Sequence, residues 1–209
     1  VEMSQFSLQI VLNNLEQCHH DEECLLMDPY LAAFKELNKF FQGLGTVFNF
    51  ISSDIASKIQ IMDAYRADQH VADKYEDIFV MVEYERKTGA LQNTSKPSGS
   101  RTVLRLNWAL EFIAHFFKRL STASENTKMS SLASESYQDT LAKHHPWYIR
   151  HGAGLALITL PTCKQMFSRA LANEKEHLPQ LLLSVSEAAQ HVFDSTQHLY
   201  AEHNLLDLP

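Results

Sequence analysis

Two arginines one helical turn apart are the residues of this 209-residue chain best suited to bind an anion. Arg101 and Arg105 belong to a segment that is otherwise largely apolar. A single guanidinium in such a segment can extend its charged end to solvent, whereas two on successive turns form a pair of forks that fits a phosphate. The spacing therefore predicts either a phosphate site or a purely structural placement, and both interpretations stay open at this point.

Asp54 and Lys58 are also separated by one turn, beside the apolar stripe of another segment. Taken alone, they predict an i,i+4 ion pair on a helix surface, worth about 0.2 to 0.5 kcal/mol. His145 stands before Pro146 and Trp147, where a helix can begin. On its own, this triplet predicts only a helix boundary with Trp147 in the core.

The chain has eleven histidines, and residues 19–24 gather two of them with acidic residues and a cysteine. Neither HExxH nor paired CxxC spacing is present, so we interpret this segment as a solvated acidic loop and expect no metal and no cofactor. GxSxG is absent as well, and Cys163 lies in no phosphate-binding loop. The motifs therefore favour a binding protein with no catalytic residues.

Composition and charge limit the partners. Eighteen Lys and Arg against 25 Asp and Glu give a net charge of −7, which opposes nucleic-acid binding over the whole surface. Three cysteines without CxxC spacing are typical of reduced thiols in the cytosol. The longest uncharged apolar run, residues 152–160, is much shorter than a membrane-spanning helix.

Hydrophobic periodicity predicts an all-α chain, and six Gly and six Pro are too few for the many turns of a β-sandwich. Helices are expected over residues 8–18, from an N-cap at Asp28 to about 44, over 48–62, through 71–82 to a C-cap at Gly89, and over 101–120. Four more helices are expected: one that ends near 144, one over 146–160, one that begins at 161 and one over 182–199. No strand is predicted. The linker-like stretch 89–100 is short, so we expect a single domain over residues 1–209.

Seven segments of the sequence are distinctive: LLMDPY at 25–30, LGTVFNFISSD at 44–54, SKI at 57–59, RTVLRL at 101–106, HPW at 145–147, TLPT at 159–162 and LYAEHNLLDLP at 199–209. In order and spacing they resemble the glycolipid transfer protein family, and within it the branch that transfers ceramide-1-phosphate. The likeness is weak over 66–96 and 122–135. It implies a two-layer sandwich of about eight helices enclosing a lipid pocket.

The resemblance also implies roles for individual residues. Asp54 matches the acidic residue that accepts hydrogen bonds from the ceramide amide and hydroxyl, and His145 matches the residue that bonds the amide carbonyl. Lys58, Arg101 and Arg105 match the cations that hold the phosphate. Arg105 stands where glycolipid-binding members carry a tryptophan, and its planar fork suits a phosphorylated headgroup.

Apolar residues that could line the acyl pocket, or equally belong to the plain core, are Leu8, Val11, Leu12, Phe41, Phe48, Phe50 and Ile51. A membrane-docking patch is expected from Trp147 and Tyr148, flanked by Lys143 and Arg150. Asn107 and Trp108 depart from the family pattern, because more polar or basic residues are expected there.

These observations together predict a non-enzymatic carrier that moves ceramide-1-phosphate between membranes. We expect a cytosolic monomer that contacts membrane surfaces transiently and reversibly and does not bind nucleic acid. Two alternatives stay open: a lipid sensor that acts through a protein partner, and a lipid hydrolase or phosphatase that uses His145, Asp54 and the arginines.

Overall fold

The computed structural model describes residues 6–21, 23–93, 95–169 and 177–209, and within them the chain is almost entirely helical. The α-helices are α1 (Leu8–Cys18), α2 (Met27–Gly43), α3 (Asn49–Ala67), α4 (Ile78–Thr88), α5 (Gly99–Ser121), α6 (Met129–Asp139), α7 (Trp147–Ile158), α8 (Cys163–Arg169) and α9 (Leu178–Glu202). Short 3-10 helices are η1 (Thr46–Phe48), η2 (Ala72–Lys74), η3 (Ala90–Gln92) and η4 (Leu141–His144).

The sequence analysis predicts no strand, but the structure contains a two-stranded antiparallel ribbon of β1 (His19–Asp21) and β2 (Cys24–Leu25). It reverses the chain between α1 and α2, and the amide of Leu26 donates to the carbonyl of Cys18 at 2.8 Å. Strands of two and three residues are too short to show an alternating pattern, so periodicity could not reveal them.

Several predicted helix boundaries are wrong. The helix expected to end at 62 continues to Ala67, and the one expected to begin at 182 begins at Leu178. Three others differ for a specific reason. Asp28 is not the N-cap of α2: the helix begins at Met27, whose amide donates to the carbonyl of Glu76, and Asp28 instead pairs with Arg66. The helix expected through 71–82 begins only at Ile78, because Asp77 caps it. The helix expected to end near 144 stops at Asp139, and η4 follows it. The predicted C-cap at Gly89 is confirmed, with a φ of +72°.

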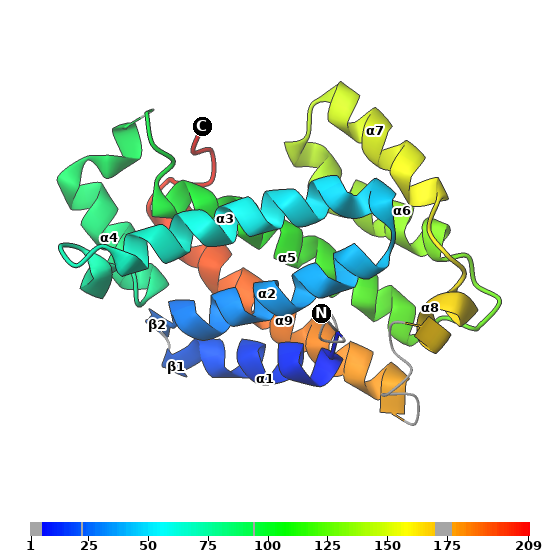
Figure 1. Cartoon of the computed structure of the whole chain (residues 1–209). Helices are drawn as coiled ribbons and strands as arrows, with labels where there is room; N and C mark the ends of the chain where they lie inside the picture. The colour runs from blue at the N-terminus through cyan, green and yellow to red at the C-terminus, as the bar shows by residue number, and fades with distance from the viewer. Residues whose placement is uncertain (1–5, 22, 94, 170–176) are drawn as a thin grey trace.

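The helices form two layers around a common core (Figure 1). Helices α1, α2 and α3 pack side by side in front, and the central helix α5 packs against α9 behind them. Helix α4 covers one end, whereas α6 and α7 lie at the other. Within the described residues, no helix is both long and apolar enough to cross a bilayer.

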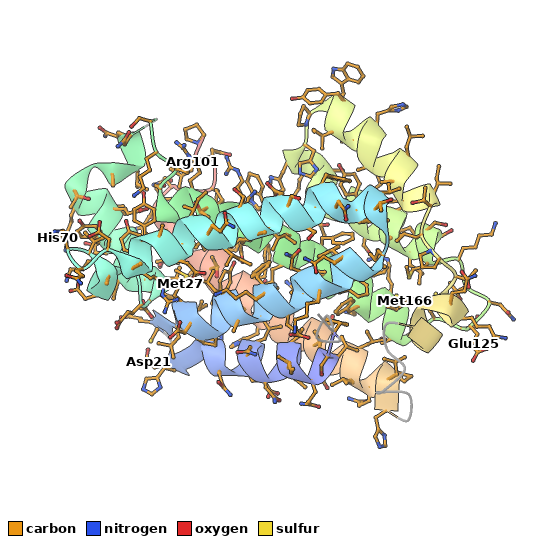
Figure 2. The ribbon with its side chains drawn as sticks, in the orientation of Figure 1. Asp21, Met27, His70, Arg101, Glu125 and Met166 are labelled. Carbon is orange, nitrogen blue, oxygen red and sulfur yellow. The ribbon has the colours of Figure 1, made fainter. Side chains whose placement is uncertain are left out.

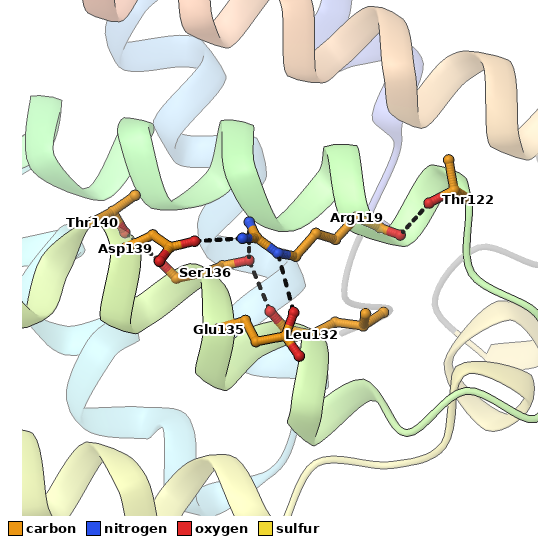
Figure 3. Close-up of polar contacts among 7 residues, drawn as sticks. All are labelled: Arg119, Thr122, Leu132, Glu135, Ser136, Asp139 and Thr140. Atoms are coloured by element: carbon orange, nitrogen blue, oxygen red, sulfur yellow. Dashed lines mark hydrogen bonds and ion pairs between the residues drawn. The ribbon is translucent and has the colours of Figure 1, made fainter.

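Side-chain contacts fix the ends of α5. The buried carboxylate of Glu85, on α4, accepts hydrogen bonds from the amides of Gly99 and Ser100 and from the hydroxyl of Tyr75. Near the other end, Arg119 reaches α6, where it pairs with Asp139 and Glu135 and donates to Ser136 (Figure 3). Helix α5 is thereby held at one end against α4 and at the other against α6.

Candidate functional site

A largely apolar cavity of about 470 Å³ lies among α3, α5 and α7, and polar residues cluster on part of its wall. Its apolar lining consists of Phe41, Phe48, Phe50, Ile51, Ile55, Trp108, Ala109, Phe112, Leu141, Ile149, Ala153, Ala156 and Leu157. Its polar lining consists of Asp54, Lys58, Arg105, Tyr137, His144 and His145. An apolar pocket with a few convergent polar groups is the usual form of a site for an amphipathic small molecule.

Asp54 and Lys58 come from the flank of α3. Ile55, Ile59 and Met62 bury the adjacent stripe of this helix, which turns the two charged residues toward the cavity. The Lys58 ammonium lies 2.5 Å from Asp54 Oδ1, so the predicted i,i+4 pair forms. Lys58 is the more buried partner, with 18% of its side chain exposed against 65% for Asp54. The pair therefore offers one carboxylate and one ammonium to a ligand.

Arg105 projects from α5 into the same wall, and its guanidinium is only partly satisfied. Nη2 donates to the carbonyl of Leu208 at 2.8 Å, whereas Nη1 is buried and has no hydrogen-bond partner among the described residues. Burial, and after it the charge of Arg101, lowers the pKa of Arg105 below its ordinary value. A guanidinium nevertheless stays charged in proteins. A buried cationic donor without a partner is suited to an anionic ligand.

Arg101 lies one turn earlier, at the N-terminal end of α5 (Figure 2). It does not line the cavity, and its Nε is buried without a hydrogen-bond partner in the described structure. The two arginines are close enough for the charge of one to lower the pKa of the other. Their shared field is therefore positive beside the cavity wall.

His145 and Tyr137, which also line the cavity, form a hydrogen-bonded pair. The Tyr137 hydroxyl lies 2.9 Å from His145 Nδ1. Burial is the main cause that lowers the pKa of His145, and Asp54 opposes it. The imidazole is therefore neutral at pH 7, and it carries one donor and one acceptor nitrogen.

The structure places some of the predicted acyl-pocket residues at the cavity and the others elsewhere. Phe41, Phe48, Phe50 and Ile51 line the cavity. Leu8, Val11 and Leu12 do not: they lie on the buried face of α1, in the core that α1 shares with α2 and α9. A helical stripe buried in plain core has the same spacing as one that lines a cavity, so the sequence cannot separate the two.

Helix α7 forms one wall of the cavity and also presents apolar residues to solvent. Ile149 and Leu157 line the cavity, whereas Trp147 at the start of the helix is 73% exposed and Tyr148 is 60% exposed. Leu155 and Ile158, which the sequence analysis missed, are exposed as well. Of the two expected flanking cations, Arg150 is exposed and Lys143 pairs with Glu111 at 3.2 Å.

Two polar residues of the site escaped sequence reasoning. Tyr137 follows a stretch where the family likeness is weak, and only the packing of α6 on α5 brings it to His145. His144 precedes His145 in the chain, yet it stacks on Trp108. The sequence feature that could have identified His144 as a site residue is its position next to His145, which matches the family motif.

Comparison with known proteins identifies the family to which this fold belongs. The glycolipid transfer protein (GLTP) family profile matches residues 25–172, so the chain belongs to the glycolipid transfer protein family. Lipid transfer proteins of this family are carriers and not enzymes, which confirms that part of the sequence prediction.

Within the family, the chain is similar to ceramide-1-phosphate transfer proteins. It is 39% identical to the protein of that name from Homo sapiens, over 98% of this chain and 97% of the relative. The crystal structure of the mouse protein without ligand matches with a TM-score of 0.91 and 38% identity, over 98% of this chain and 100% of that one.

The human ceramide-1-phosphate transfer protein in complex with 2:0 ceramide-1-phosphate matches with a TM-score of 0.89 and 37% identity, over 99% of this chain and 100% of that one. These likenesses confirm the all-α, two-layer fold that the sequence predicted.

Proposed function

We propose that this protein binds ceramide-1-phosphate in the cavity of α3, α5 and α7 and carries it unchanged between membranes. The observation that supports this most is the buried Nη1 of Arg105, which has no hydrogen-bond partner in the part of the chain that the structure describes. It lies on the wall of an apolar cavity that Asp54, Lys58 and His145 also line. One wall thus combines phosphate donors with partners for a sphingoid amide.

The charges of the site balance a phosphate monoester. Lys58 and Asp54 largely cancel, which leaves the two positive charges of Arg101 and Arg105. A phosphate monoester carries about 1.5 to 2 negative charges at pH 7. We assign the phosphate to Arg105, Arg101 and Lys58, and the amide and hydroxyl of the ceramide to Asp54 and His145.

The apolar part of the cavity suits the hydrocarbon chains. At about 0.8 kcal/mol per methylene, exposing two long chains to water costs on the order of 20 kcal/mol, so the lipid does not travel free. We assign the lining of the chain pocket to Phe41, Phe48, Phe50 and Ile51, which already face the cavity. The whole chain then acts as one lipid-transfer domain.

Docking on a membrane is assigned to the exposed start of α7. Trp147 and Tyr148 offer aromatic rings with polar ends, which favour the headgroup layer of a bilayer, and Arg150 adds a cation for anionic lipids. The net charge of −7 weakens the attachment of the protein to anionic membranes. Weak attachment suits a carrier, because a carrier must dissociate from the membrane after each transfer. We accordingly propose a cytosolic protein that associates with membranes only transiently.

Native mass spectrometry tests the proposal. The purified protein is incubated with ceramide-1-phosphate, with ceramide and with phosphatidic acid of matched chain length. We expect a one-to-one complex with ceramide-1-phosphate whose lipid keeps its mass, together with transfer of that lipid between vesicles. A lipid that loses its phosphate would indicate a phosphatase. Binding without transfer would favour a sensor that acts through a protein partner.

A further inference from the structure

We propose that Trp108 is a positioning residue, which holds the guanidinium of Arg105 in the orientation that receives the lipid phosphate. This inference rests on the proposed function, because it concerns the phosphate that Arg105 would bind. It gives a role to a tryptophan at a position where the sequence analysis expected polar or basic residues.

The geometry is a three-layer stack. The Arg105 guanidinium carbon lies 4.4 Å from the centre of the Trp108 ring. The ring of His144 lies 3.8 Å from the Trp108 ring and is inclined to it by only 5°. Two planar groups this close to one ring must lie on opposite faces of it. Trp108 is therefore held between η4 and its own helix neighbour, and it cannot turn away from Arg105 without breaking the His144 contact.

The remaining contacts of Arg105 complete the orientation. Its guanidinium carbon lies over the Trp108 ring, and its Nη2 donates to the carbonyl of Leu208. Nη1 is left as a buried donor without a partner in the described structure. An arginine side chain has several rotatable bonds, and fixing it before the ligand arrives removes an entropy cost from binding. The stack thus holds Nη1 of Arg105 in position for a charge-assisted hydrogen bond to the lipid phosphate before the lipid binds.

The neutral state of His144 suits this arrangement. Its ring is surrounded by Lys143, His145 and Arg105, with Asp207 as the opposing charge, and burial is the main cause that lowers its pKa to about 4. A neutral imidazole can stack on the indole without repelling the nearby guanidinium. The π face of Trp108 in turn attracts a cation such as Arg105.

The proposal separates the contribution of Trp108 to the phosphate from any contribution to the hydrocarbon chains. If Trp108 acts through Arg105, its loss weakens the binding of ceramide-1-phosphate and leaves the binding of ceramide unchanged. If Trp108 serves only as cavity lining, both lipids lose affinity alike. Phe112, one turn further along α5 and also in the lining, provides the matched comparison.

The experiment is a double-mutant cycle on the full chain, with affinities for ceramide-1-phosphate and ceramide measured on vesicles of neutral lipid. We expect Trp108→Leu to weaken ceramide-1-phosphate binding about tenfold and Trp108→Phe, which keeps a ring, to weaken it less. Trp108→Leu combined with Arg105→Leu should bind no worse than Arg105→Leu alone. Phe112→Leu should affect both lipids equally.

A second measurement does not depend on lipid. In the NMR spectrum, the Nε proton of Arg105 should be shifted upfield by the Trp108 ring, and this shift should disappear in Trp108→Leu. Trp108→Met, which keeps more of the volume, replaces the Leu variant if the latter fails to fold.

Additive losses in the double mutant, or equal losses for both lipids, would overturn the role of Trp108. A wild-type protein with no preference for ceramide-1-phosphate over ceramide would overturn the proposed function as well.

Discussion

The Tyr137 hydroxyl lies 2.9 Å from Nδ1 of His145, and this contact joins α6 to the turn between η4 and α7 at the wall of the cavity. Burial raises the pKa of Tyr137, so its hydroxyl stays protonated and can donate to Nδ1. When it does so, the imidazole proton is on Nε2, where it can be donated to a lipid carbonyl. In that arrangement Nε2 is the donor nitrogen of His145.

Tyr137→Phe removes this contact. One hydrogen bond is worth about 0.5 to 1.5 kcal/mol, so we expect affinity to fall roughly twofold to tenfold. Because the amide is common to both lipids, ceramide and ceramide-1-phosphate should be affected alike in a vesicle binding assay. Tyr84→Phe, on α4 and away from both the cavity lining and α7 (Figure 1), is the control. Unchanged affinity for both lipids would show that Tyr137 does not set the His145 tautomer.

Arg101→Leu and Arg105→Leu should each weaken ceramide-1-phosphate binding about a hundredfold, because a charge-assisted contact to a partly buried phosphate is worth about 2 to 3 kcal/mol. Transfer of the lipid between vesicles is the measurement, and circular dichroism should show the same helicity as the wild type. The matched control is Arg86→Leu, a surface arginine on α4 paired with Glu83. Normal transfer in both site variants would refute the assignment of the phosphate.

Asp54→Val should abolish the binding of every sphingolipid and the discrimination against phosphatidic acid, which has no amide. The reason is that Asp54 accepts hydrogen bonds from the sphingoid part and does more than pair with Lys58. An exposed i,i+4 pair alone is worth only a few tenths of a kcal/mol, so thermal stability should change little. If Asp54→Val transferred the lipid as well as the wild type, Asp54 would serve only as the ion-pair partner of Lys58.

Trp147→Ala should weaken vesicle association and slow transfer while the melting temperature stays nearly constant. The indole is 73% exposed, and truncating it therefore opens no cavity in the core. Truncation of a core tryptophan would instead cost about 3 to 5 kcal/mol. Partitioning and melting are measured on the same variant, and a loss of stability with unchanged partitioning would argue against α7 as the docking element.

The free energy of unfolding should decrease as the pH falls from about 6.5 to about 4. Burial lowers the pKa of His144 from 6.5 in the unfolded chain to about 4 in the folded protein. Between these two values His144 is protonated in the unfolded chain but not in the folded protein, so a falling pH favours unfolding. His144→Phe keeps a ring to stack on Trp108 and removes this titration. Its melting temperature should depend less on pH than that of the wild type. An identical pH dependence would show that His144 does not contribute.

The sequence by itself determined the helical class and the family, because apolar spacing and the motifs at 44–54, 101–106 and 145–147 are local properties of the chain. The same is true of the Asp54–Lys58 pair, which depends on helical periodicity alone. These features survive in any packing of the helices, and so they can be read without a structure.

Only the tertiary structure decided which residues meet at the cavity. Leu8 and Phe41 show the same kind of apolar spacing, yet one lies in plain core and the other lines the cavity. Tyr137 reaches His145, Trp108 stacks between Arg105 and His144, and Leu208 bonds Arg105 across 103 positions of sequence. Such contacts depend on how separate helices pack, and periodicity within one helix carries no information about its neighbours.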